Sequence, residues 1–406
     1  VRQMRYRVVV TGLGTLTPYG EGAKCLWEGL LSKKTPLAWH APWQHVVGRV
    51  REEECPSLSA LFSSGQKREM GRVATWAVAT AKQAVDDAGM AEADHSETVV
   101  NVGTGVVDLE LIGETAQLVA AGKERRISPF FLPRILNNLP AGYVAMKYGM
   151  RGGVECSSTA CATGAHSIGH VFSRIRDGSA RRGIAGSVEA AATPLGVIAF
   201  ERMRALATGE SAESCPFDSR RSGFVLSEGA ALLFLERLED ALTRRATIYA
   251  EIAGFGISSD IGHITTPPAD GSGILMAMKR ALADARIQAE DVTYVNAHAT
   301  STRVGDSAEA AAISSLLPHQ PLVSSNKGHL GHLLAAAASV ETTATLLALQ
   351  KKRVPATLGL VQSDCAPLNH ALHGAELPLR PHVALMNSSG FGGTNAVLVL
   401  KSCEEE

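Results

Sequence analysis

The hydrophobic positions of the chain alternate between short apolar runs that end at glycines and longer segments with helical spacing. Residues 7–14 form a β-branched run ending in glycine, and residues 74–87 then carry apolar side chains at helical spacing until Gly89. The same order returns as a strand-like segment at 99–105 and a helical segment at 136–148. This alternation predicts an α/β protein with parallel strands covered by helices.

A further helical segment follows the sequence STACATG, because apolar residues between 168 and 175 recur at i, i+3, i+4 and i+7. A strand, small polar residues and an Ala-rich helix around His332 echo this arrangement. The segment ATIYAEIAGFGISSD also resembles the opening RYRVVVTGLGTLTPYG. We therefore predict two related halves, 1–246 and 247–406. The alternative is that α/β composition alone produces such echoes.

Composition narrows the class of protein. The chain has 406 residues, a formal net charge of −1, 45% hydrophobic residues and 39 glycines, which suits an α/β enzyme with many tight turns. We expect no nucleic-acid partner and no membrane span, because the charge is balanced and no apolar run approaches roughly 18 residues. Seven irregularly spaced cysteines without a CxxC pair predict free thiols, a reducing compartment and no metal centre.

Cys161 is the first candidate for chemistry. It lies in STACATG, at the start of the expected helix and between small residues that would let a thioester approach the sulfur. The unpaired N–H groups of a helix N-terminus favour a thiolate, so we predict a lowered pKa for Cys161 and a role as an acyl-accepting nucleophile. The alternative is a buried structural cysteine, which is the commoner case for a lone cysteine.

Two histidines lie at the ends of expected elements, where active-site groups are commonly held. His298 in VNAHATST ends a strand, and His332 in SNKGHLGHLLAAAA opens the Ala-rich helix. Lys327 would supply fixed positive charge, and Glu341 lies about two and a half helical turns beyond His332. The alternatives for these residues are core histidines, an exposed surface lysine and a solvated helix face.

The glycine-rich segment NSSGFGGTNAVLV surrounds Phe391 near the end of the chain. Its glycines lack the spacing and the strand–turn–helix setting of a dinucleotide-binding loop. We expect instead a turn that places a backbone N–H donor at a site.

The segments STACATG, VNAHATSTRVGD, SNKGHLGHLLAAAA and NSSGFGGTN occur in an order and at separations that belong to a known family. The chain resembles the elongating β-ketoacyl-[acyl-carrier-protein] synthases of the thiolase superfamily. The resemblance runs nearly from end to end and includes RVVVTGLGTLTPYG, SPFFLP and GFVLSEGA. It implies an α/β thiolase fold of five layers, α-β-α-β-α, with two duplicated halves about a pseudo-dyad, assembled as a homodimer.

The resemblance also implies a reaction, the decarboxylative Claisen condensation of acyl- and malonyl-carrier protein in fatty-acid elongation. Cys161 would take the acyl chain, with its own N–H group and that of Phe391 as the oxyanion hole, while His298 and His332 would assist the loss of CO2. Lys327 and Glu341 match the supporting charged pair. We expect no bound cofactor, because the carrier protein brings its own phosphopantetheine.

Further positions match substrate contacts of the family. Plain core packing is an equally weighted alternative for those that match the acyl tunnel. The matches are Thr300 and Thr302 for the phosphopantetheine arm, Phe200, Phe131 and Val106 for the acyl tunnel, and Gly392 in the glycine turn.

Three departures from the family pattern stand near these motifs. Ser389 occupies a position where the family commonly has Phe, and it leaves the acyl chain-length preference open. Asn326 replaces a more usual Ser or Thr, and His329 adds an imidazole without an assigned role.

The implied partner, an acyl carrier protein, is typically acidic, so the resemblance predicts a local basic dock. Surface salt bridging or solubility is the alternative for most of the candidates. Lys67, Arg68 and Arg204 are the main candidates, and Arg72, Arg125, Arg126 and Arg202 are further ones.

Three rival classes share parts of the pattern. A thiolase usually has a second catalytic cysteine in a late C-x-G motif, whereas the late glycine loop here has none. Initiating ketosynthases pair His with Asn, and a non-enzymatic partner subunit of the chain-length-factor type lacks the active cysteine. The phrases ISPFFLPRILNN and RRATIYAE favour a mitochondrial enzyme, with the bacterial cytoplasm or a plastid as alternatives.

Overall fold

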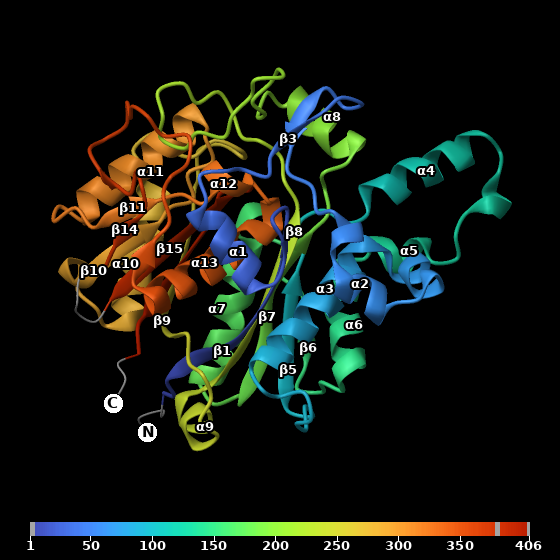
Figure 1. The fold of residues 1–406 in the computed structure, drawn as a ribbon, viewed down its shortest axis with the longest axis horizontal. Coiled ribbons are helices and arrows are strands. Elements are labelled where there is room, and N and C mark those ends of the chain that lie inside the picture. Colours follow the sequence, from blue (N-terminus) through green and yellow to red (C-terminus); the bar gives the residue numbers. More distant parts are fainter. Residues whose placement is uncertain (1–4, 378–381, 404–406) are drawn as a thin grey trace.

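The computed structural model describes residues 5–377 and 382–403. Most strands belong to one sheet with the order β13-β11-β10-β15-β16-β9-β1-β8-β7-β5-β6, and β2 pairs with β1 (Figure 1). The strands are β1 Val8–Thr17, β2 Gly20–Glu21, β3 Ala38–His40, β4 His45–Val47, β5 Thr98–Gly103, β6 Val154–Glu155, β7 Arg182–Glu189, β8 Gly229–Arg237, β9 Ala250–Ser259, β10 Val292–Asn296, β11 Leu322–Ser324, β12 Arg353–Val354, β13 Asn369–His370, β14 Ala375–Glu376, β15 Val383–Gly390 and β16 Thr394–Lys401.

Helices cover the outer faces of this sheet, and two more helices lie between its two halves (Figure 1). The α-helices are α1 Ala23–Leu31, α2 Pro56–Leu61, α3 Ser64–Asp87, α4 Leu109–Ala120, α5 Phe131–Ile135, α6 Leu139–Tyr148, α7 Thr163–Arg176, α8 Pro194–Arg202, α9 Leu238–Thr243, α10 Ser272–Ala285, α11 Arg303–Leu316, α12 Lys327–Leu330 and α13 Ala337–Lys351. Short 3-10 turns are η1 Glu52–Glu54, η2 Glu124–Arg126, η3 Ala160–Ala162, η4 Ala289–Asp291 and η5 Leu334–Ala336.

The sheet consists of two halves with the same topology. In the first half, the order β1-β8-β7-β5-β6 has two antiparallel pairings followed by two parallel ones. In the second half, β9-β16-β15-β10-β11 repeats the same senses. The halves join where β1 and β9 pair over only three residues each. The predicted duplication of the fold is confirmed, while the division at 246/247 stays a prediction.

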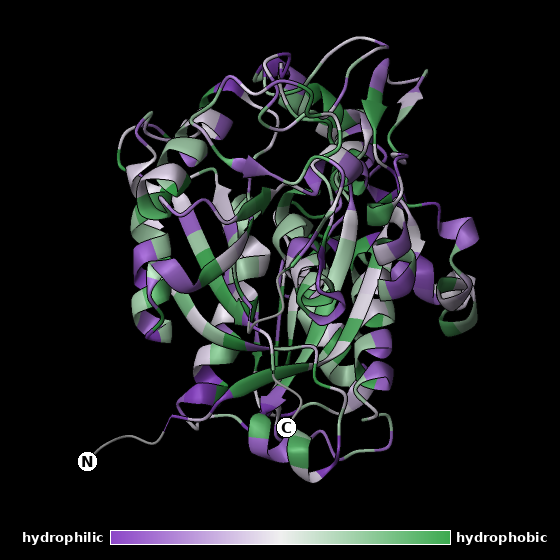
Figure 2. Cartoon of the chain, turned by 60° about the vertical axis from the view of Figure 1, so that its left-hand side comes forward, coloured by the Kyte–Doolittle hydropathy of each residue, from purple (hydrophilic) through white to green (hydrophobic). Residues whose placement is uncertain are grey.

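The two half-sheets enclose a central layer made of α7 and α13. Ile168 and Phe172 of α7 and Leu346 of α13 belong to one core cluster with residues of strands from both halves. Every residue of α13 from Ala337 to Leu349 is buried, which explains its small and apolar composition. Figure 2 shows hydrophobic stretches along the inner strands and hydrophilic bands on the outer helices.

Two outer helical layers complete the fold. Helices α3 and α6 share a core cluster with β5, β7 and β8, and α10 and α11 share another with β10, β15 and β16. The order is therefore α-β-α-β-α, and the predicted five-layered fold is confirmed. Within the described residues, no helix has both the length and the apolar character needed to cross a bilayer.

The largest difference from the predicted elements concerns α3, which begins at Ser64 rather than at residue 74. A capping box between Ser63 and Gln66 starts it, and Gly71, with a φ of 70°, kinks it. The pattern missed this first part because its exposed polar residues carry no apolar periodicity. Helices α4 and α5, which the pattern did not predict separately, project from the body (Figure 1).

Candidate active site

Cys161 lies in the 3-10 turn η3, directly before α7. Ala160 has a left-handed φ of 50°, a strained conformation for a residue with a Cβ, which marks a constrained turn. Gly164 is required nearby, because a Cβ there would lie 2.3 Å from the Ser339 hydroxyl on α13. The small residues of STACATG therefore let α7 approach α13 closely, and they place the thiol where the two halves meet.

The predicted nucleophile and histidines are brought together. The Cys161 sulfur lies 3.0 Å from Nε2 of His332. The backbone of His332 is fixed on both sides, since its N–H donates to the Val225 carbonyl at 2.8 Å and its carbonyl accepts from the Ser227 N–H at 3.0 Å. The His298 ring stands edge-on to the His332 ring, with centroids 5.5 Å apart. One half contributes the thiol and the other contributes both imidazoles.

Lys327 and Glu341 form a buried ion pair. Their exposed fractions are 1% and 2%, so the alternatives of a surface lysine and a solvated helix face are both wrong. Burial raises the pKa of Glu341 to about 7 against the pull of the Lys327 charge. A buried pair of this kind costs desolvation energy, which its mutual attraction offsets only while both partners are present.

The site is electrically neutral at its centre. Burial lowers the pKa of His298 and of His332 well below the usual value, and the Lys327 charge acts in the same direction. Burial raises the pKa of Cys161 to about 12, although Lys327 and the Phe391 N–H act against it. The predicted lowering of the thiol pKa is therefore wrong, because desolvation outweighs the effect of the nearby helix N-terminus.

Two buried carboxylates on α11 hold the loop that follows β10. Glu309 accepts the N–H of His298 at 2.9 Å. Asp306 accepts the N–H groups of Thr300 and Thr302 at 2.9 Å and 3.3 Å. The two acids are three residues apart and so lie on one face of the helix. Their contacts fix the backbone of one predicted catalytic residue and two predicted substrate contacts.

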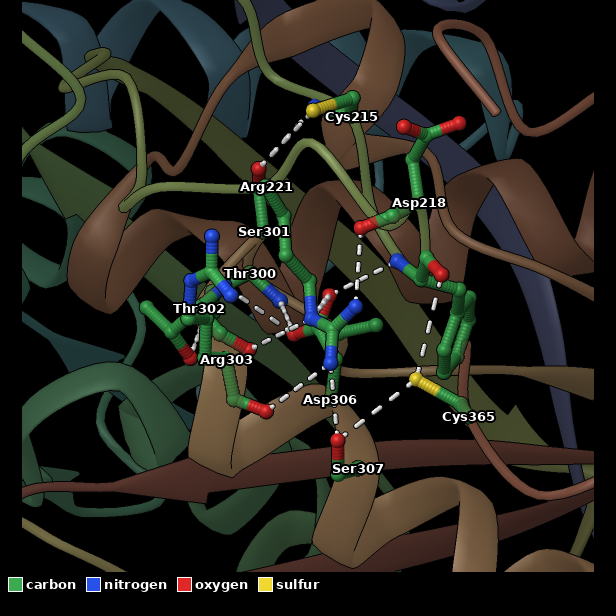
Figure 3. Close-up of polar contacts among 12 residues, drawn as sticks. Cys215, Asp218, Arg221, Thr300, Ser301, Thr302, Arg303, Asp306, Ser307 and Cys365 are labelled. Carbon is green, nitrogen blue, oxygen red and sulfur yellow. Dashed lines mark hydrogen bonds and ion pairs between the residues drawn. The ribbon is translucent and has the colours of Figure 1, made fainter. Parts of the chain in front are cut away.

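Arg221 closes the other side of this loop, as Figure 3 shows. Its guanidinium group is buried, donates to the Ser307 hydroxyl at 2.8 Å and to the Thr302 carbonyl at 3.3 Å, and forms an ion pair with Asp364. Its Nε also lies 3.9 Å from the Asp306 carboxylate. The loop is thus held between α11 and the segment that precedes β8.

Sequence reasoning missed these three positioning residues. Asp306 and Glu309 stand in GDSAEA, shortly after His298, and acidic residues in the first turns of the following helix are a signal that would have found them. Arg221 gave no such signal, because the burial of an arginine depends on tertiary packing that SRRSG does not encode locally.

The glycine turn after β15 lies against the thiol. The Phe391 N–H acts on the Cys161 sulfur, and Gly392 adopts a φ of 84° while its N–H donates to the Ile264 carbonyl at 2.7 Å. Ser389 lies just before the turn and donates to Asn395 Oδ1 at 2.6 Å. A backbone donor at the site is therefore present as predicted.

A cavity of about 430 Å³ opens at Cys161. We call it the chamber. Its walls include His298, His332, Thr300, Thr302, Phe200, Arg204, Ser389 and Phe391. The predicted tunnel residues Phe131 and Val106 are not among the residues that line the chamber. Phe131 begins α5, and the Val106 N–H donates to Glu189 at 3.3 Å. Their role in an acyl tunnel stays a prediction.

The departures from the family pattern have structural partners. His329 is buried, with Nδ1 3.1 Å from the Tyr19 hydroxyl and Nε2 3.2 Å from the Ala356 carbonyl. Burial lowers its pKa to about 4. Asn326 accepts a hydrogen bond from Asn296 at 2.7 Å. The imidazole without an assigned role thus serves to connect α12 to the rest of the body.

The basic residues predicted for the dock differ in whether their charge is free to contact a partner. Lys67 and Arg68 lie in the first turns of α3, and Arg204 is exposed beside the chamber. Arg72 is a correction, because its guanidinium group pairs with Glu228 at 2.7 Å and with Glu52 at 2.8 Å. Its charge is used inside the protein and is not free for a partner.

The chain is similar to known proteins over nearly its whole length. The family described as Beta-ketoacyl synthase, N-terminal domain, matches residues 5–241, and its C-terminal domain matches residues 249–361. The mitochondrial 3-oxoacyl-[acyl-carrier-protein] synthase of Arabidopsis thaliana is 37% identical over 98% of this chain and 93% of its own. The 3-oxoacyl-[acyl-carrier-protein] synthase 2 of Vibrio harveyi is 38% identical over 98% of this chain and 99% of its own.

A solved structure shares the fold at similar coverage. It is a type II PKS ketosynthase in complex with its acyl-carrier protein and bound to the hexaketide, and it superimposes with a TM-score of 0.88 at 31% identity. The alignment covers 98% of this chain and 100% of that chain.

Proposed function

Because the chain belongs to the beta-ketoacyl synthase family, we propose that it catalyses the decarboxylative condensation of acyl- and malonyl-carrier protein in fatty-acid elongation. One observation carries the proposal: the Cys161 sulfur lies 3.0 Å from His332 Nε2, and a second imidazole stands beside it. A nucleophile within hydrogen-bond reach of a base is what covalent acyl transfer needs.

Acyl transfer comes first. The Cys161 proton passes to His332 as the sulfur attacks the acyl thioester carbonyl, which suits a resting pair that is neutral. The N–H groups of Cys161 and Phe391 stabilise the oxyanion. The carbon–sulfur bond to the carrier then breaks, and the carrier thiol leaves with the proton.

Decarboxylation and condensation follow at the same site. The malonyl group loses CO2, and its bonding electrons form an enolate whose oxygen is stabilised by His298 and His332. The enolate carbon attacks the acyl thioester on Cys161 and expels the sulfur as a thiolate, which takes up a proton from solvent as the β-ketoacyl product forms. Thr300 and Thr302 position the phosphopantetheine arm of the carrier, and no resident cofactor is needed.

Product analysis tests this proposal against a thiolase. Purified chain is incubated with acyl- and malonyl-carrier protein, and CO2 and β-ketoacyl-carrier are measured. We expect both products in equal amounts. Condensation of two acetyl-CoA molecules without CO2 release, or the absence of any condensation, would refute the proposed activity.

The carrier protein is proposed to dock on Lys67, Arg68 and Arg204. Basic residues on α3 and beside the chamber provide charge complementary to an acidic partner. Reversing Lys67 and Arg68 to Glu should raise the KM for carrier substrates several-fold and weaken its salt dependence. Reversal of Lys24, an exposed lysine on α1, is the matched control. Equal kinetics of both variants at low ionic strength would remove these residues from the dock.

We also propose a homodimer built on the side of α5, α6 and β6. Leu132 on α5 and Met146 on α6 are 62% and 80% exposed, and β6 is the edge strand of its sheet among the described residues. Apolar side chains beside an open strand fit a second copy. Light scattering should give twice the mass of the chain, and Met146→Lys should lower it.

We propose a mitochondrial location for the chain, which its similarity to a mitochondrial relative supports.

A further inference from the structure

Glu189 is a buried acid that the proposed mechanism does not use. It is the last residue of β7, and its exposed fraction is 0%. A carboxylate in such a place costs free energy unless donors surround it. Its position at the end of an apolar strand therefore needs an explanation.

Backbone N–H groups surround this carboxyl group. It accepts from Gly105 at 3.2 Å and from Val106 at 3.3 Å, and N–H groups of Ala335 and Ala190 also act on it. Burial raises the pKa of Glu189 to about 8, while these donors favour its ionised form. The carboxyl group thus connects three segments: the turn after β5, the end of β7 and η5.

The packing against Glu189 leaves no room for a side chain at position 105. A Cβ on Gly105 would lie 2.7 Å from Glu189 Oε2 and 3.2 Å from the Ala335 Cβ. Gly105 and Ala335 therefore approach each other closely with the carboxyl group between their backbones. A side chain at 105 would displace either the acid or η5.

The residue before Ala335 forms part of the chamber wall. Leu334 lines the chamber with Cys161 and has a φ of 50°, which is strained for a leucine. Ala335 itself is held on both sides, because its N–H donates to Glu189 and its carbonyl accepts from the Ser187 hydroxyl at 2.7 Å. The end of β7 therefore stabilises a turn that would otherwise relax.

We propose that Glu189 is a positioning residue that sets the room for the acyl chain beside Cys161. Its carboxyl group fixes Leu334 on one side and the Gly105–Val106 turn on the other. The inference rests on the proposed acyl transfer to Cys161 and adds a determinant of acyl chain length. Because the malonyl step uses the histidines and not this space, it should be largely independent of Glu189.

The test compares Glu189→Gln with the unaltered enzyme, using acetyl- and decanoyl-carrier protein as acyl donors. The amide keeps the size of the side chain but turns an NH2 group toward N–H donors. We expect kcat/KM for decanoyl transfer to fall roughly tenfold or more, with acetyl transfer and malonyl decarboxylation within about threefold. Equal losses with both donors, or no loss with either, would overturn the inference.

A second variant and a control separate positioning from stability. Gly105→Ala should push the carboxyl group out of its place and produce the same selective loss. Glu236→Gln removes another buried acid, which bonds to Thr11 and Arg244, and should leave the ratio of decanoyl to acetyl transfer unchanged. If the unaltered enzyme takes neither acyl group, the proposed function fails; if only the selective loss is missing, the inference fails.

Discussion

The two central helices begin in the same way but carry different chemistry. A 3-10 turn precedes each, η3 before α7 and η5 before α13, and each turn starts at a residue with a left-handed φ of 50°, Ala160 or Leu334. The first turn presents the Cys161 thiol, whereas the second begins two residues after His332. The two turns therefore share one backbone geometry, and their different chemistry comes from the residue types placed on it.

The two regions also differ in how their buried charged groups are stabilised. On the side of α13, Lys327 and Glu341 neutralise each other as a buried pair. On the side of α7, the acid Glu189 is held by backbone N–H groups. The thiol belongs to one region and its base to the other, so activity depends on the contact between them.

Removal of either imidazole should have the largest effect on activity. We expect His298→Ala and His332→Ala each to lower malonyl decarboxylation by roughly a thousandfold, because each removes a donor to the developing enolate. Acyl transfer should persist in part, since the thiol remains. Release of labelled CO2 from malonyl-carrier protein measures the first step, and a normal rate in both variants would refute their pairing.

Breaking the charged pair should have the next largest effect. Lys327→Met leaves Glu341 buried without a partner and should lower the free energy of unfolding by about 3–5 kcal/mol. Burial then holds the folded pKa of Glu341 above its unfolded value, so the loss grows as pH rises. The double variant Lys327→Met, Glu341→Leu should recover most of the stability in denaturant titrations. No recovery would mean that the pair does not act as a unit.

Periodicity in the sequence predicted an α/β fold with two related halves, whereas the five layers were implied by the family resemblance. The sites of Cys161, His298 and His332 were predicted because each follows or precedes an element with clear periodicity. The sequence did not predict their electrostatics. The thiol pKa follows from burial by the opposite half, which a local argument about one helix end does not include. The role of Glu189 was missed for the same reason, because an acid is exposed or buried according to what packs on it. Asp306 and Glu309 were missed although their place in the first turns of α11 was a usable signal.

The smallest expected effect concerns the stability that the buried His329 side chain contributes where it connects α12 to the rest of the protein. Its folded pKa of about 4 lies below the usual value of 6.5, so its contribution to stability is present above pH 6.5 and is lost as pH falls toward 4. Acidification from about pH 7.5 to about pH 5 should destabilise the unaltered protein by about 2 kcal/mol more than His329→Gln. Parallel curves of unfolding free energy against pH would contradict the buried neutral imidazole.

The nucleophile is tested most directly by the intact mass of the protein after incubation with acyl-carrier protein alone. We predict that each chain gains one acyl group and that Cys161→Ala gains none. Acylation that persists in Cys161→Ala would contradict the assignment of the nucleophile and, with it, the proposed function.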